Sequence, residues 1–272
     1  MKWPLEGIFN GTQEIADLAE YKNFRLFHLP EMASNEKQND LLIKDVKWTS
    51  TSDVESLKKF SAVCSLTAKF MGNVLGKDKV FGLIDTNWGG TRVEAWMPPQ
   101  AFESCGISNN YVDKNRPQNS YSSLYNAMIH PLTRLDIKGV LWYQGEANAW
   151  WKKDDYACNF PSMIESWRNI WSESTKTSSK FPFGFMQLGT QKKVNRNQLF
   201  PQMRWHQTAH FGYVPNDFMQ VCTLIDISYF YKVIGLCFRM YSWECHWIHL
   251  IKLVESIQET NSCLHLGLQQ LD

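Results

Sequence analysis

Apolar residues recur along the chain with two periodicities, one typical of helices and one of buried strands. Helical spacing predicts helices over residues 12–21, 54–74, 122–129 and 154–171. Short apolar runs predict strands over residues 24–29, 80–84, 138–143 and 183–188. Ser52 and Glu55 have the spacing of a capping box, and Gly76 is expected to end the helix that follows. Alternating strands and helices predict parallel pairing through right-handed crossovers, and therefore an α/β fold.

Polar residues follow two of the predicted strands at the point where each strand ends. Residues 85–91 read Asp-Thr-Asn-Trp-Gly-Gly-Thr, and residues 140–148 read Val-Leu-Trp-Tyr-Gln-Gly-Glu-Ala-Asn. Because ligands of parallel sheets bind at the carboxyl ends of strands, these segments form the candidate site. Gly89 and Gly90 would let a substrate approach a backbone amide closely, although many Gly-Gly pairs only form a tight turn.

Three polar side chains follow the second of these strands: Gln144, Glu146 and Asn148. Burying them without partners is costly, so they must either face a cleft or find hydrogen-bond partners. A loop that only braces the sheet is the structural alternative to a binding role.

The two segments resemble blocks of the SGNH-type serine esterases, specifically the sialate O-acetylesterase family. Further counterparts of that family are found at residues 8–12, 94–96, 126–131, 181–184, 204–209 and 211–216. The resemblance implies a three-layer α/β/α sandwich with a mostly parallel sheet of the flavodoxin-like kind, here incomplete. It predicts a partial SGNH-type esterase domain over residues 1–221 and a divergent tail over residues 222–272.

Members of that family remove acetyl groups from sialic acid hydroxyls by a serine acyl-enzyme route, without a metal or organic cofactor. The resemblance therefore implies O-acetylated sialic acid, or a related acetylated sugar, as substrate. It also implies that Gly89 or Gly90 offers a backbone amide to the oxyanion. Asn148 is then the first candidate for a side-chain donor, Gln144 is the second, and Glu146 is an orienting residue. The sequence leaves open which of the three donates.

Two parts of the family's catalytic machinery are missing from the 272 residues. No Ser-Gly-Gln-Ser-Asn block occurs, and only the Met that follows it in the family has a counterpart, Met1. Residues 223–229, where the family's catalytic His is expected, contain no His. We therefore expect that no catalytic residue is retained and that the chain is inactive and marginally stable. A missing nucleophile strand would remove a buried central strand and open a sheet edge.

The sequence beyond Val221 lacks clean periodicity, and we expect a helical or disordered extension there. Its apolar stretches are too short for a membrane span.

His246 and His249 lie in a segment that does not match the family's base. His130 and His206 lie in matching segments, and structural or cleft-lining roles are expected for them. Three hypotheses stay open: a truncated or alternatively spliced acetylesterase, a catalytically dead carbohydrate-binding relative, or a non-functional product of a mispredicted gene.

Composition excludes some other partners. The chain has 28 Lys and Arg against 27 Asp and Glu, without a basic stripe, so nucleic acid is not an expected partner. Its seven Cys form no C-x-x-C pair, which argues against a zinc site.

Asn10 begins an Asn-Gly-Thr sequon that would be glycosylated only in the secretory path. The first residues show no signal peptide, so the secreted or lysosomal location implied by the family stays open.

Overall fold

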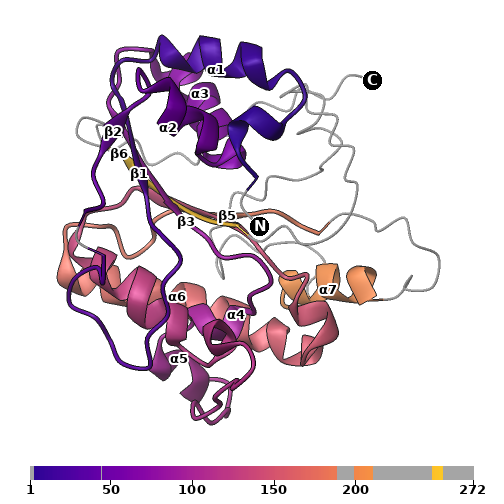
Figure 1. Cartoon of the computed structure of the whole chain (residues 1–272). Coiled ribbons are helices and arrows are strands. Elements are labelled where there is room, and N and C mark those ends of the chain that lie inside the picture. The colour runs from indigo at the N-terminus through magenta and orange to yellow at the C-terminus, as the bar shows by residue number, and fades with distance from the viewer. Residues whose placement is uncertain (1–2, 44, 189–198, 211–246, 254–272) are drawn as a thin grey trace.

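The computed structural model describes residues 3–43, 45–188, 199–210 and 247–253 (Figure 1). The strands of its sheet are β1 (Phe24–His28), β2 (Thr49–Ser50), β3 (Phe81–Thr86), β4 (Gly139–Tyr143), β5 (Phe183–Phe185) and β6 (Trp247–Leu253). The α-helices are α1 (Gly11–Ala19), α2 (Val54–Lys59), α3 (Ala62–Leu75), α4 (Val93–Trp96), α5 (Pro99–Glu103), α6 (Tyr156–Ser174) and α7 (Leu199–Gln207). Shorter helical turns cover Leu5–Gly7, Pro117–Asn119, Tyr125–Ile129, His130–Arg134, Asn148–Trp150 and Lys153–Asp155.

The strands form one sheet in the order β2-β1-β3-β6-β4-β5. β1 is parallel to β3, with Phe24 opposite Phe81, and β4 is parallel to β5, with Val140 opposite Phe183. Helices α1, α2 and α3 lie over one face of this sheet, and α4, α5 and α6 lie over the other (Figure 1). The α/β fold with three layers is therefore confirmed. No helix in the described ranges is long and apolar enough to cross a membrane.

β6 lies between β3 and β4 and runs antiparallel to both. Phe81 of β3 is paired with Leu253, and Val140 of β4 is paired with Leu250. The expectation of a helical or disordered tail is therefore wrong for Trp247–Leu253, and the expected open edge is occupied by this strand. The pairing depends on two neighbouring strand edges that need partners, a tertiary effect that the local periodicity of residues 247–253 does not report.

The larger of two hydrophobic clusters packs between the sheet and helices α4 to α6. Trp142 of β4 lies at its centre, only 1% exposed, with its ring 5.9 Å from that of Trp167 and 6.4 Å from that of Trp96, both edge-on. Aromatic rings in such edge-to-face arrangements contribute beyond the area that they bury. The inner side of β4 is therefore fixed by packing, which fixes the point where the chain leaves the strand.

The predicted helix over residues 54–74 is divided into α2 and α3. Phe60 adopts an extended backbone at the break and its side chain is buried, 1% exposed. Ser61 then begins the second helix, since its hydroxyl accepts a hydrogen bond from the backbone N–H of Cys64 at 3.4 Å. Periodicity alone missed the break because apolar spacing continues across it.

The cap of α2 also differs from the sequence prediction. Asp53, not Ser52, is the N-cap, and its carboxylate accepts a hydrogen bond from the backbone N–H of Ser56 at 3.2 Å. Gly76 does end α3 as predicted, with a φ of 111° that residues with a side chain rarely adopt. The predicted C-terminal end at Gly76 is thus confirmed, and the observed N-cap of α2 lies one residue after the predicted one.

A disulfide joins Cys105, after α5, to Cys158 in α6, across 53 residues of sequence. It closes a loop that includes β4 and the polar segment following it. Among the described residues Cys64 is a free thiol, buried in the core.

Replacing both Cys105 and Cys158 by Ser should lower the free energy of unfolding by about 4 kcal/mol, since a cross-link over 53 residues restricts the unfolded chain. Urea unfolding of the oxidised protein and of the double variant measures the difference. Reductant should destabilise the wild type much more than the double variant. An equal loss in both proteins would contradict the assignment.

Candidate functional site

The carboxyl ends of β3 and β4 lead into two loops, residues 87–91 and residues 144–148. Each loop contains a glycine with positive φ: 74° at Gly90 and 135° at Gly145. A Cβ built on Gly145 would lie 3.3 Å from Cδ1 of Leu188, so both the backbone conformation and the space favour glycine. The turn-forming role expected of glycine is present in both loops. Gly89 and Gly90 are half-buried.

The two loops are tied together by buried amide side chains. Nε2 of Gln144 donates to the carbonyl oxygen of Thr91 at 3.1 Å and to Oδ1 of Asn148 at 2.7 Å. The same Oδ1 accepts the backbone N–H of Val93 at 2.9 Å. Gln144 is 1% exposed and Asn148 is fully buried, so these bonds replace water completely. The loop after β4 thereby fixes the loop after β3.

Asn148 also holds a buried carboxylate. Its Nδ2 donates to Oε2 of Glu94 at 2.9 Å, and Nδ2 of Asn159 in α6 donates to Oε1 at 3.3 Å. Glu94 is fully buried, and burial raises its pKa while the bond from Asn148 opposes that rise. In this structure the amide groups of Gln144 and Asn148 are thus engaged in hydrogen bonds that join the two loops to each other and to Glu94. The oxyanion role of either residue stays a prediction.

Two residues that were not predicted from the sequence form hydrogen bonds with Gln144. The hydroxyl of Tyr156 in α6 donates to Oε1 of Gln144 at 3.0 Å. Nε2 of Gln207 in α7 donates to the backbone carbonyl of Gln144 at 3.2 Å, while its Oε1 accepts the N–H of Leu188 at 2.9 Å. Both lie on helices whose apolar faces meet the core, and a polar residue on such a face was the available signal.

Glu146 lies in the same loop and is partly buried, with its Oε2 atom inaccessible to solvent. Burial raises the pKa of Glu146 to about 8, because removal from water penalises the charged form. The orienting role expected from the resemblance stays a prediction.

A second polar group occupies the carboxyl ends of β1 and β3. His28 and Asp85 face each other in register, and Nδ1 of His28 lies 3.1 Å from Oδ2 of Asp85. Asp85 is fully buried, and its Oδ1 accepts a hydrogen bond from Nδ2 of Asn87. The His28 side chain is 43% exposed. Sequence reasoning missed this pair, although an Asp inside the apolar run of β3 was a visible signal.

His130 and His206 also have polar partners. Nδ1 of His130 lies 2.8 Å from the carbonyl oxygen of Gln38. Nε2 of His206 lies 3.2 Å from Asp154, and its Nδ1 lies 2.7 Å from His210. Burial, followed by the charge of His210, lowers the pKa of His206. No group of three His, Cys, Asp or Glu side chains in the described ranges is arranged to hold a metal ion.

The other predicted residues lie away from the loops or outside the described ranges. Asn10 is exposed at the start of α1, with a φ of 60°, and its glycosylation stays a prediction. The backbone of His249 lies in β6, in register with Asp85. His246 lies outside the described residues.

Comparison with known proteins gives a consistent result. The family described as carbohydrate esterase, sialic acid-specific acetylesterase, matches residues 15–217. The chain is 38% identical to the human sialate O-acetylesterase over 223 residues, which is 78% of this chain and 42% of that protein. It is 34% identical to the mouse sialate O-acetylesterase over 255 residues, 80% of this chain and 47% of that protein. The chain thus spans less than half the length of these relatives.

A solved structure resembles the chain as well. It is a carbohydrate acetylesterase from Xanthomonas citri, with a TM-score of 0.65 and 26% sequence identity. The match covers 84% of this chain and 48% of that one.

Replacing Asn148 by Leu should lower the free energy of unfolding by about 2–5 kcal/mol, because Glu94 and the Val93 N–H each lose a buried partner. Asn115→Leu is the control, since Asn115 is exposed and its change should cost little. Chemical denaturation of both variants measures the costs. Similar small values for the two would show that the Asn148 bonds do not hold the loops.

Glu146→Gln should remove a pH dependence of stability. A carboxyl group with its pKa raised from 4.5 to about 8 keeps a proton that the unfolded chain releases in that window. The free energy of unfolding of the wild type should therefore fall as the pH rises from about 4.5 to 8. The variant should match the wild type near pH 5 and exceed it at pH 8. Melting temperatures across this range, parallel in both proteins, would refute the shift.

Proposed function

The chain belongs to the carbohydrate esterase family of sialic acid-specific acetylesterases, and on that premise we propose that it forms the acyl-binding part of a sialate O-acetylesterase site. The reaction proposed is hydrolysis of O-acetyl esters of sialic acids through a serine acyl-enzyme. The substrate's acetyl group would lie at the carboxyl ends of β3 and β4, where Gly89 and Gly90 are half-buried.

The observation that carries the proposal is the connection between the two loops. Oxyanion stabilisation requires donors that are already in place when charge develops, since reorganising them would raise the barrier. The carbonyl of Thr91 and the amide of Val93 are each bonded to the loop after β4, so the segment that begins at Gly89 is held from its far side. Such a fixed loop suits a backbone oxyanion donor at Gly89 or Gly90.

Gln144 and Asn148 act in this proposal as positioning residues. The side-chain amide of Gln144 donates to Thr91 in the neighbouring loop, and that of Asn148 donates to Glu94. Their replacement would then lower turnover by displacing the glycine amides.

We further propose that the 272-residue chain does not catalyse the serine route by itself. The sequence contains no Ser-Gly-Gln-Ser-Asn block. Among the histidine side chains that the structure describes, those of His28, His130, His206 and His210, none is hydrogen-bonded to a serine hydroxyl. Without a nucleophile and its base, binding and oxyanion donors leave only a small part of the acceleration.

The test compares acetate release by two proteins, with 9-O-acetylated sialic acid and an aryl acetate as substrates. One is this chain, and the other is the same chain joined to the family's Ser-Gly-Gln-Ser-Asn-Met and His blocks. Turnover is expected in the joined form alone, and a serine-directed phosphonate should abolish it. Phosphonate-sensitive turnover by the 272-residue chain would contradict the proposed inactivity. No turnover by either form would contradict the proposed reaction and favour a carbohydrate-binding relative.

A further inference from the structure

Arg92 and Trp151 bring together the ends of the two loops of the candidate site. Arg92 follows Thr91, and Trp151 follows the helical turn that begins at Asn148. The guanidinium carbon of Arg92 lies 3.9 Å from the centre of the Trp151 ring, so the cation is stacked on the indole face. The ring of Tyr111 lies 5.4 Å from Trp151 and continues the aromatic surface.

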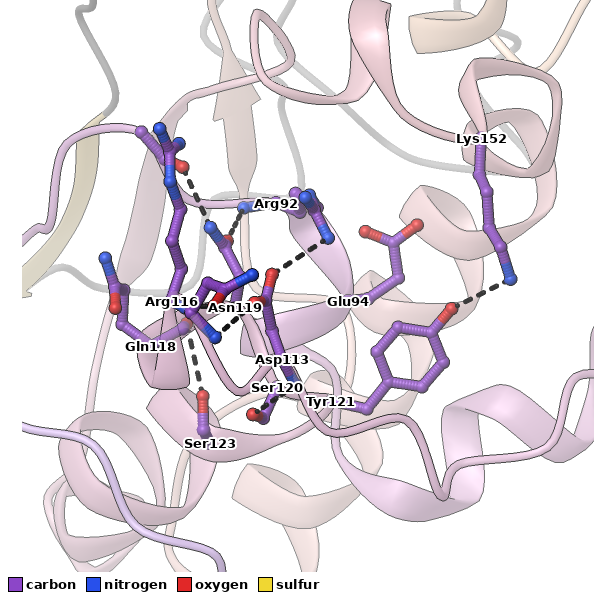
Figure 2. Close-up of polar contacts among 12 residues, drawn as sticks. Arg92, Glu94, Asp113, Arg116, Gln118, Asn119, Ser120, Tyr121, Ser123 and Lys152 are labelled. Carbon is purple, nitrogen blue, oxygen red and sulfur yellow. Dashed lines mark hydrogen bonds and ion pairs between the residues drawn. The ribbon is translucent and has the colours of Figure 1, made fainter.

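Two nitrogen donors at this contact lack an acceptor. Nη1 of Arg92 and Nε1 of Trp151 are both inaccessible to solvent, and neither has a hydrogen-bond partner within the described residues. The carboxylate of Asp113 lies 3.6 Å from Nη1 of Arg92, an ion pair longer than a hydrogen bond (Figure 2). Buried donors without acceptors are costly and uncommon, so such a pair points to a ligand or a water molecule.

Lys152 follows Trp151 in the sequence and adds a second cation to this part of the site. It adopts a left-handed backbone with a φ of 45°, and its ammonium donates to the hydroxyl of Tyr121 at 3.2 Å. Figure 2 shows Arg92 and Lys152 on the two sides of Glu94. Arg92 and Lys152 are thus two cations in this part of the site, and positive charge favours an anionic ligand.

The kind of anion follows from hydrogen-bond chemistry. A hydroxyl brings its own hydrogen, whereas a carboxylate only accepts, and the two groups without partners are both donors. A guanidinium binds a carboxylate in particular through paired N–H groups. We propose that Arg92 and Trp151, assisted by Lys152, bind the carboxylate of an acidic sugar. The inference rests on the proposed function, because it assigns this subsite to the sialic acid that carries the ester.

Binding to the 272-residue chain tests the inference without any need for turnover. Isothermal titration calorimetry compares the methyl glycoside of N-acetylneuraminic acid with its carboxylate methyl ester. The acid should bind at least tenfold more tightly than the ester. Arg92→Gln should weaken binding of the acid roughly tenfold to a hundredfold and binding of the ester little, as expected for a charged hydrogen bond.

Trp151→Phe is the sharper variant, because it keeps the aromatic face and removes only the N–H group. It should weaken binding of the acid about threefold to tenfold. Arg116→Gln is the matched control, since Arg116 is exposed on the neighbouring loop and should leave both affinities unchanged. Thermal melts confirm that each variant is folded.

Three outcomes would overturn the subsite: equal affinity for acid and ester, equal weakening of both by Arg92→Gln, or no binding of either sugar. Acid-selective binding that depends on Arg92, together with a joined chain that releases no acetate, would leave the subsite supported. It would contradict only the proposed esterase reaction.

Discussion

The amide side chains of Gln144 and Asn148 are hydrogen-bonded in a volume from which water is excluded, and both loops of the candidate site take their position from these bonds. An amide has a donor and an acceptor on one rigid plane, so it can join two backbones and a carboxylate at once. In a buried environment each bond is also costly to break. Glu94 is part of the same arrangement, since its charge is tolerated there because two amides donate to it.

This arrangement explains why much of the site could be located from the sequence although its internal contacts could not. A strand such as β4, followed at once by Gln144, Gly145 and Glu146, identifies a strand end with polar groups that need partners. The direction of each amide depends on Thr91 and Val93, which lie more than 50 residues away along the chain. No local pattern contains that information.

The same distinction applies to the fold. β1, β3 and β4 and the long helix α6 follow from apolar periodicity, because their faces are buried by the nearest layers. The helix expected over residues 122–129 is present, with α-helical residues 123–124 followed by a π-helix over Tyr125–Ile129, whereas the helix over residues 54–74 is interrupted at Phe60 and Ser61. At such places a capping hydroxyl or a tertiary contact outweighs helix propensity. β6 is the extreme case, since its place is set by its neighbours alone.

The place of β6 has a consequence for the order of folding. Phe81 is paired with Leu253 and Val140 with Leu250, so the centre of the sheet depends on contacts between segments remote in sequence. Loop-closure entropy must be overcome before such contacts form, which slows folding. During synthesis the facing edges of β3 and β4 are made long before β6 leaves the ribosome. The nascent chain thus exposes both strand edges while the residues between Tyr143 and Trp247 are translated, and chaperones that bind such edges would act on it in that interval.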